Sequence, residues 1–209
     1  MNPTRGFSVL AINRLPRSRG WRPSGRFLFA GFSRDRKNES SGLAALTIDD
    51  DATGALTRVP GPPSSTGSDQ GPLWRAIAPS GRFLYSAHTQ ATLLTVHAID
   101  LATGALSPAP VATHFTGNHL RAFPRWLSLD RSGRFLYATA LASLISPSPE
   151  GWVLVYRVDE TTGELKALPS VHLSGKPAGL AVVGPHAETS RASTAARPRS
   201  NGAIVCSLT

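Results

Sequence analysis

The chain has a single cysteine, Cys206, among its 209 residues. One cysteine cannot form an intrachain disulfide, so no such bond stabilises the fold, and the cysteine count does not indicate the redox compartment. No apolar run approaches the roughly 18 residues that a membrane-spanning helix requires. The N-terminus also lacks the apolar segment of a secretory signal. We therefore expect a cytoplasmic protein that has no membrane partner.

Lysine is also scarce, although the formal net charge is +9. The basic residues are mostly arginines scattered along the chain, without interleaved aromatics or the periodicity of a helix that could enter a groove. These absences argue against a specific nucleic-acid partner and leave an anionic small molecule as the favoured one. The first 36 residues hold eight arginines and one acid, which also fits an organellar presequence. The strand-like segment 7–12 favours the folded alternative.

Familiar catalytic and metal-binding motifs are missing as well. The sequence contains no Gly-x-Ser-x-Gly elbow and no phosphate-cradling loop. His114, His119, His172 and His186 are expected in loops without metal-ligand spacing, and His97 is expected to pack within a strand. We therefore expect no metal and no cofactor.

What the chain does contain is an internal repeat. The heptapeptide Ser-Gly-Arg-Phe-Leu-(Phe/Tyr)-(Ala/Ser) occurs at 24–30, 80–86 and 132–138. A proline precedes each repeat glycine by nine residues, and each unit later reaches an Asp-x-x-Thr-Gly turn. A period of about 50 residues is typical of one blade of a β-propeller. The repeat predicts an all-β fold in which Phe27, Phe83 and Phe135 occupy equivalent buried positions.

The same signals divide the chain into blades. The Phe-Leu-Tyr runs suit strands buried on both faces, and the Asp-x-x-Thr-Gly turns suit hairpin loops with glycine at positive φ. We assign Asp50 to such a turn, as for Asp100 and Asp159. The blades are predicted at 16–60 (blade A), 72–112 (blade B), 124–170 (blade C) and 177–183 (partial blade D), followed by a low-complexity tail at 184–209 with a final strand at 203–208.

Each full blade is expected to have four strands. Further short strands are expected at 7–12 and 178–183. The strands are predicted at 17–22, 26–32, 42–48 and 55–59 in blade A, at 73–78, 82–88, 92–99 and 105–111 in blade B, and at 125–129, 134–140, 152–158 and 164–168 in blade C.

The unit from Pro79 to Leu106 carries a family resemblance. It reads Pro-Ser-Gly-Arg-Phe-Leu-Tyr, then a strand with Leu-Leu-Thr-Val-His-Ala-Ile-Asp, then Ala-Thr-Gly-Ala-Leu. It resembles the lactonase-type seven-bladed β-propeller family, which includes bacterial 6-phosphogluconolactonase and fungal carboxymuconate-lactonizing enzymes. The resemblance extends over roughly 7–183. It implies a hydrolase of a sugar or phosphosugar lactone in carbohydrate metabolism, or a lactonizing isomerase.

Length departs from that family, because seven blades at about 50 residues each need roughly 340 residues. Two arrangements remain open. The chain is either an open arc of three full blades plus partial ones, or a closed four-bladed ring in which 7–12 joins the C-terminal strands. We favour the open arc, which leaves sheet edges uncovered and so predicts self-association.

The resemblance also suggests site residues. In the family, a Pro-Arg pair that opens a blade is followed sixteen residues after the arginine by a glutamate, and both are implicated in the site. Pro124-Arg125-Trp126 matches the first element, and Pro16-Arg17 matches it again. The resemblance thus implies Arg125, Arg17 and Trp126 as substrate-binding residues. The glutamate positions hold Ser33, Thr89 and Leu141, and the family's histidine-containing blade start is missing.

A histidine that breaks the repeat offers a base. His88 stands where blade A has Phe32 and blade C has Ala140. A histidine with a near-neutral pKa can accept a proton from water, so we predict that His88 and Arg125 act together in lactone hydrolysis. The structural alternatives are a rim histidine and an arginine that bonds backbone at the blade start. For the whole chain, the alternative is an inactive propeller fragment that binds a protein or a carbohydrate, or a truncated product with no function of its own.

Overall fold

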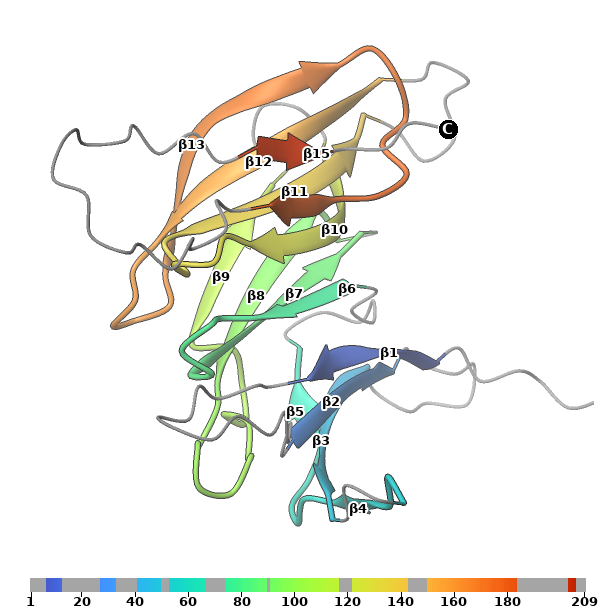
Figure 1. Cartoon of the computed structure of the whole chain (residues 1–209), viewed down its shortest axis with the longest axis vertical. Helices are drawn as coiled ribbons and strands as arrows, with labels where there is room; N and C mark the ends of the chain where they lie inside the picture. Colours follow the sequence, from blue (N-terminus) through green and yellow to red (C-terminus); the bar gives the residue numbers. More distant parts are fainter. Residues whose placement is uncertain are drawn as a thin grey trace, which may run out of the picture.

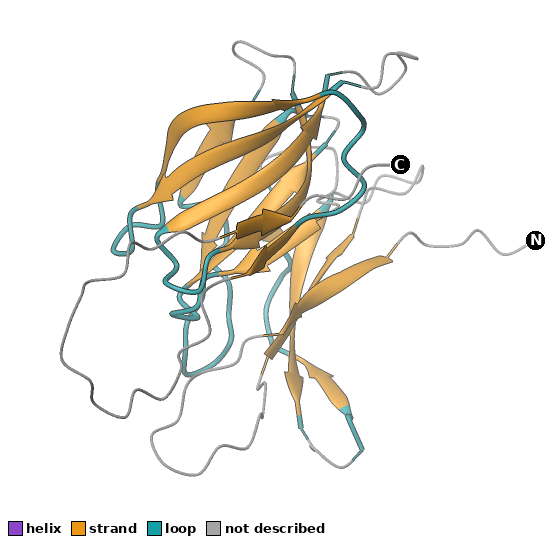
Figure 2. Cartoon of the chain, turned by 45° about the horizontal axis from the view of Figure 1, so that its top comes forward, coloured by secondary structure: helices purple, strands orange, loops and turns teal. Residues whose placement is uncertain are grey.

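The computed structural model describes residues 7–12, 27–32, 41–49, 53–66, 74–89, 91–116, 122–142, 150–183 and 203–205. All regular elements in these segments are β-strands, as Figure 2 shows. Because the described segments contain no helix, they also contain no helix able to span a membrane. The prediction of an all-β fold is confirmed.

The strands form four antiparallel sheets. Blade A contains β1–β5, blade B contains β6–β9, blade C contains β10–β13, and the two-stranded sheet of blade D contains β14 and β15. The strand bounds are Phe7–Ile12, Phe27–Phe32, Gly42–Ile48, Leu56–Arg58 and Ser64–Ser65 for β1 to β5; Trp74–Ile77, Phe83–His88, Leu93–Ala98 and Ala112–Phe115 for β6 to β9; Phe123–Leu129, Phe135–Leu141, Gly151–Val158 and Leu165–Leu173 for β10 to β13; and Ala181–Val183 and Ala203–Val205 for β14 and β15.

The sheets follow one another as an arc (Figure 1). Their first strands lie side by side along its inner edge, since β6 contacts both β1 and β10, and β10 contacts β14. Strand β1 pairs with β2, whereas β15 pairs with β14. The N-terminal strand therefore does not join the C-terminal strands in a closed fourth blade, and the structure has the open-arc form.

Two expected strands lie elsewhere. The place beside β2 that was predicted for 17–22 is taken by β1, and residues 13–26 lie outside the described part. In blade B, the segment 105–111 makes only a bridge between Ile99 and Leu106, and the fourth strand is β9. Pro108 and Pro110 explain this shift, because proline has no N–H to donate to a sheet ladder. The ladder resumes immediately after them.

Two apolar cores lie between the blades. One joins Phe27, Phe29 and Leu43 of blade A to residues of blade B, and the other joins blade B to blade C. Every residue of β7 is buried, because both faces of this strand meet a neighbouring blade. The apolar residues Phe83, Leu84, Tyr85 and Ala87 suit that position, and Ser86 and His88 are buried with them.

The turn aspartates fix the ends of the third strands. Asp100 Oδ1 accepts hydrogen bonds from the backbone N–H groups of Ala102 and Thr103, and Asp159 makes the equivalent pair. In blade A the backbone N–H of Asp49 bonds the carbonyl of Ala55, as that of Asp100 bonds Ala105. The backbone of Asp49 is therefore equivalent to that of Asp100, and the predicted Asp50 lies outside the described residues.

The three repeat phenylalanines are not equally buried. Phe27 and Phe83 are 1% and 6% exposed, whereas Phe135 is only half-buried. The prediction of equal burial is wrong for Phe135, because its blade has no complete blade packed on the far side.

Candidate functional site

The match to the family's Pro-Arg element lies on β10, the inner strand of blade C. Pairing between β10 and β11 is regular on both sides but shifts register between Pro124 and Leu127. Such a bulge redirects side chains and is common next to binding sites. The two redirected residues are Arg125 and Trp126, which are both half-buried.

Arg125 and Trp126 form a cluster with a second tryptophan. The Arg125 Cζ lies 4.7 Å from the centroid of the Trp126 ring. Trp74, the first residue of β6, lies with its ring centroid 5.3 Å from that of Trp126, at an interplanar angle of 42°. The cluster therefore joins the inner strands of blades B and C through a cation–π contact and an aromatic pair. We name these three residues the Arg–Trp cluster.

The cationic groups of this region are partly withdrawn from water. Arg125 Nε is buried and has no hydrogen-bond partner within the described part of the chain. An unmet buried donor costs about 1–3 kcal/mol, which a bound oxyanion would relieve. Arg75, next to Trp74, is 8% exposed, and burial lowers its pKa to about 10, so it stays cationic near neutral pH. The cluster is thus suited to an anion that also presents an apolar face.

The positions of the family's glutamate have structural roles here. Thr89 is 4% exposed, and its Oγ1 donates a 2.7 Å hydrogen bond to the carbonyl of Pro124. Leu141 is 6% exposed and pairs with Phe123 at the end of β10. Ser33 lies outside the described residues. Thr89 and Leu141 therefore support the segment that carries Arg125 but supply no carboxylate to it.

The other predicted site residues are His88 and Arg17. His88 ends β7 and is 0% exposed, and its Nε2 lies 3.0 Å from Thr95 Oγ1. Its neighbour Thr89 bonds the carbonyl of Pro124, the residue before Arg125. Arg17 lies outside the described residues, so its place relative to Arg125 stays a prediction.

The other described histidines, His97, His114 and His172, contact backbone or aromatic rings. His97 is buried as expected, and its Nε2 lies 2.8 Å from the carbonyl of Ser65 in blade A. His114 and His172 were expected in loops but lie on β9 and β13. Each packs edge-on against an aromatic ring. The ring centroids of His114 and Tyr156 lie 4.8 Å apart, and those of His172 and Trp152 lie 5.4 Å apart. β9 is the displaced fourth strand of blade B, and β13 continues beyond its predicted end at residue 168, which explains the difference. His119 and His186 lie outside the described residues, and the described residues contain no cluster of metal-ligating side chains.

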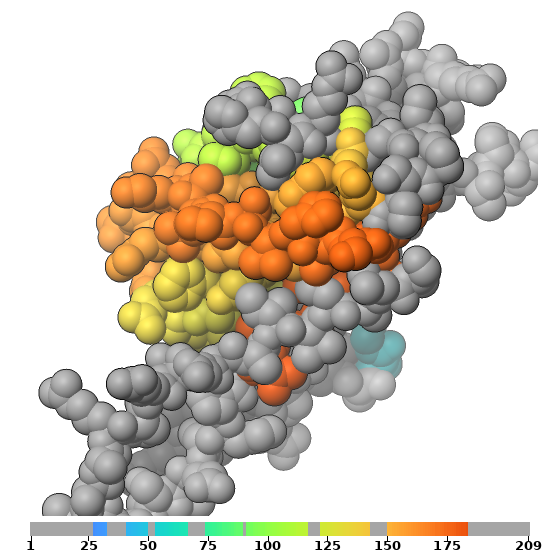
Figure 3. All heavy atoms as spheres, turned by 90° about the horizontal axis from the view of Figure 1, so that it is seen from above, coloured from blue at the N-terminus to red at the C-terminus, as the bar shows by residue number. Residues whose placement is uncertain are grey.

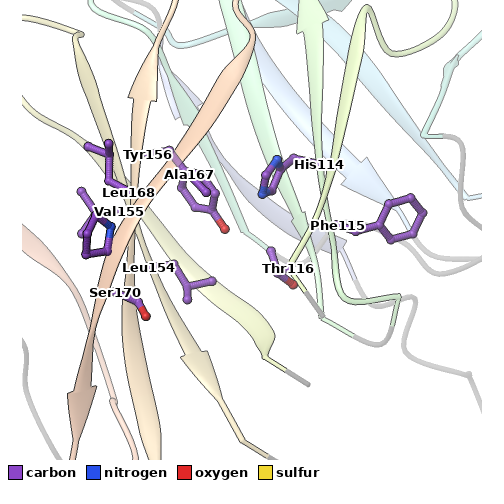
Figure 4. A pocket seen from close by; sticks show the side chains of 10 residues that line it. His114, Phe115, Thr116, Leu154, Val155, Tyr156, Ala167, Leu168 and Ser170 are labelled. Carbon is purple, nitrogen blue, oxygen red and sulfur yellow. The ribbon is translucent and has the colours of Figure 1, made fainter. Parts of the chain in front are cut away.

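A hollow of about 390 Å³ lies between the outer strands of blades B and C (Figure 4). His114, Phe115 and Thr116 line one side, and the Tyr156 ring points toward His114 from the other. Burial lowers the pKa of His114, which favours its neutral form. The lining contains no carboxylate, lysine or arginine, so this hollow offers no charged partner to an anionic ligand. Sequence reasoning missed both this hollow and Trp74, because each depends on contacts between blades.

The stacked four-stranded sheets and the cluster on their inner strands define a segment of a β-propeller. No family model matches the chain. Curated proteins named 6-phosphogluconolactonase are similar: one from Yersinia pseudotuberculosis is 31% identical over 118 residues, and one from Serratia proteamaculans is 29% identical over 116. Each match covers 54% of this chain and 31% of the relative. The chain thus spans about a third of the length of these relatives.

Solved structures agree on the fold. A Bacteroides uniformis protein provisionally named 6-phosphogluconolactonase has a TM-score of 0.53 at 17% identity, covering 75% of this chain and 44% of its own. Yeast Sqt1 has a TM-score of 0.54 at 14% identity, covering 86% and 39%. Such identities show the fold alone. The solved structures confirm the propeller fold, and the curated relatives confirm the expected resemblance: over about half of its length the chain is similar to proteins named 6-phosphogluconolactonase.

Proposed function

We propose that this chain is a lactonase-like propeller segment that binds an anionic sugar lactone, such as 6-phosphogluconolactone, and opens it by hydrolysis. The observation that carries the proposal is the partly buried guanidinium of Arg125, which lies over Trp126 with an Nε that has no described partner. The names of the curated relatives support the same substrate class. Because a phosphorylated sugar does not cross a bilayer unaided, we place the activity in the cytoplasm.

In this proposal the Arg–Trp cluster binds the substrate at two points. Arg125 pairs with the phosphate through its planar fork, which a lysine cannot reproduce. The indole rings of Trp74 and Trp126 pack against the C–H face of the sugar. Binding of this kind orients the lactone and accounts for a preference for phosphorylated over neutral lactones.

Hydrolysis adds one water molecule to the lactone. The water oxygen forms a bond to the carbonyl carbon, the ring C–O bond breaks, and the released oxygen takes a proton to become a hydroxyl. Negative charge develops on the carbonyl oxygen during the attack, and in this proposal the cation Arg75 favours that charge while Arg125 holds the phosphate. Because His88 is fully buried, we propose it as a positioning residue beside Thr89, which bonds the carbonyl of Pro124, and not as the base that contacts the water.

The test of substrate binding is lactone opening at controlled pH, with the spontaneous rate subtracted. Arg125→Ala should lose most of the rate above background, and Arg125→Lys should recover only part of it. Arg134→Ala is the matched control, since Arg134 is an exposed arginine of the repeat. Binding of 6-phosphogluconate, measured by calorimetry, gives a readout that does not need turnover. A folded wild-type chain that neither binds this product nor exceeds the background rate would overturn the proposal, as would equal effects of the two alanine variants.

The role of His88 is tested separately. His88→Ala should lower kcat more than it raises KM, and His88→Gln should restore part of kcat, because the glutamine amide can still bond Thr95. Rates are normalised to the folded fraction measured by circular dichroism. Unchanged kinetics per folded molecule would limit His88 to stabilising the blade.

A further inference from the structure

A glycine–phenylalanine contact recurs at both interfaces between full blades. The turn glycine of blade B, Gly104, lies against the ring of Phe27, and the turn glycine of blade C, Gly163, lies against the ring of Phe83. A Cβ at Gly163 would stand 2.7 Å from Phe83 Cδ1, which is closer than real side chains approach. Each turn therefore fits onto the opening phenylalanine of the blade before it, and only glycine permits the fit.

A leucine completes each contact. Two residues after the turn glycine, Leu106 packs into the core that contains Phe27, and Leu165 packs into the core that contains Phe83. Burial raises the pKa of Tyr85 in blade B, and the carboxylate of Asp159 raises it further. The turn of blade C therefore brings a negative charge close to blade B. We name the glycine and leucine of each turn the clip, and the phenylalanine face that receives it the socket.

The clip of blade A has no socket. Gly54 has the same left-handed backbone as its counterparts, with φ of +66°, but no described atom lies within 4 Å of a Cβ built there. Leu56, two residues later, is 49% exposed. The first blade thus presents both parts of a clip to solvent.

The socket of blade C is incompletely covered. Tyr137 is half-buried, whereas its counterpart Tyr85 is fully buried in blade B. Phe135 and Phe83 differ in the same way. Figure 3 looks onto this end of the arc and shows residues of β12 and β13 (orange) at the surface. Strand β14 contacts β10, so blade D lies toward the inner strand. The open part of the socket therefore lies over the outer strands β11, β12 and β13.

Charged side chains stand at both open ends. Phe135 pairs across strands with Arg157, which in turn pairs with Lys166, and both basic side chains are exposed. In the covered socket of blade B, the partner of Phe83 is the uncharged Ala98. At the other end, Asp49 begins an acidic run that the sequence continues through residue 51, but the clip strand β4 also ends in the exposed Arg58. A charge attraction is therefore confined to Asp49 on the clip side and Arg157 on the socket side.

We propose that two copies of this chain associate head to tail, with the blade A clip of one copy bound to the blade C socket of the other. The clip and the outer strands continue the pattern of the two interfaces inside the chain, with basic residues added on the socket side. Beside β10, the place that an incoming first strand would take is already held by β14. A head-to-tail contact of this kind closes into a ring if the rotation allows it and otherwise extends into a chain. The proposal does not depend on lactone binding.

The test is the molar mass of the full chain measured by light scattering over a concentration series. Wild-type protein should show a mass of two or more copies that falls on dilution. Leu56→Asp should raise the dissociation constant roughly tenfold or more, because it places an unpaired charge at the buried centre of the contact. Val111→Asp is the matched control, since Val111 is also 49% exposed but lies in neither the clip nor the socket. A wild-type chain that is single at all concentrations, or equal effects of the two aspartates, would overturn the proposal.

A pair of charge variants adds a second, specific measurement. Arg157→Glu should weaken association, and mixing it with Asp49→Lys should restore association, because the two reversed charges then face each other. Disulfide crosslinking tests the same contact in a Cys206→Ser background. Leu56→Cys mixed with Phe135→Cys should form an intermolecular disulfide. Val111→Cys mixed with Phe135→Cys is the control and should form none. Failure of both the rescue and the selective crosslink would contradict this contact even if the chain self-associates.

Discussion

Thr89 Oγ1 donates a 2.7 Å hydrogen bond to the carbonyl oxygen of Pro124, across the boundary between blades B and C. The bond fixes the residue that immediately precedes Arg125. Thr89 stands at a position where the family resemblance implied a glutamate, and it supplies a structural hydroxyl there. The proposed substrate anchor Arg125 and the packing of blades B and C are consequently linked at this point.

We expect Thr89→Val to weaken both properties. The variant keeps the shape of the side chain but leaves a buried carbonyl without its donor, which should lower the free energy of unfolding by about 1–3 kcal/mol. It should also raise KM for the lactone more than it lowers kcat, since Arg125 loses part of its support. Urea unfolding and lactone kinetics measure the two effects. Thr113→Val, at an exposed position of β9, is the control, and equal behaviour of the two variants would contradict the link.

Gly163→Ala should destabilise the chain more than Gly54→Ala. Both glycines have positive φ, +78° and +66°, so both variants bear the strain of a left-handed alanine, about 1–2 kcal/mol. Only the Cβ at Gly163 would overlap the Phe83 ring, which adds about 1–3 kcal/mol of overpacking. Urea unfolding at low protein concentration, where single copies prevail, measures both variants. The difference between their losses of unfolding free energy gives the contribution of the overlap with the Phe83 ring. The double variant Gly163→Ala with Phe83→Leu should recover part of the difference, and a lack of recovery would show that the ring is not the obstacle.

Stability should fall as the pH drops below about 6.5, and His97 should contribute to the fall. Burial lowers the pKa of His97, although its contact with the carbonyl of Ser65 acts in the opposite direction. The unfolded chain therefore binds a proton at a higher pH than the folded chain does, so the stabilisation is present above the unfolded pKa and is lost as pH falls through the window beneath it. His97→Gln should flatten this pH dependence in urea unfolding, whereas His172→Gln, at an exposed position, should not. An unchanged slope in His97→Gln would assign the effect to other groups.

The repeat in the sequence was sufficient to predict the two middle strands of blades B and C and the turns that follow them. β7, β8, β11 and β12 lie within a residue or so of their expected bounds, and the turn glycines have the positive φ that was predicted. These features are local, because alternating turns and strands depend on neighbouring residues. The displaced fourth strand of blade B was also foreseeable, since Pro108 and Pro110 interrupt the segment that was predicted to pair.

The candidate site was only partly accessible from the sequence. The resemblance indicated Arg125 and Trp126, and both lie together on the inner strand of blade C. It did not indicate Trp74, which meets Trp126 only because β6 and β10 lie side by side. Nor did it show that His88 would be fully buried against Thr95, since burial depends on the neighbouring blade.

By itself, the sequence determined the blade as a unit: its period, its four strands, and the glycine that each turn requires. Only the tertiary structure decided how the units meet. It set the pairing of β1 with β2, the bulge that redirects Arg125, and the fit of Gly104 and Gly163 on a phenylalanine of the preceding blade. The physical reason is that strand and turn propensities act over a few residues, whereas these contacts join residues tens of positions apart and form only when two apolar sheet faces are buried together.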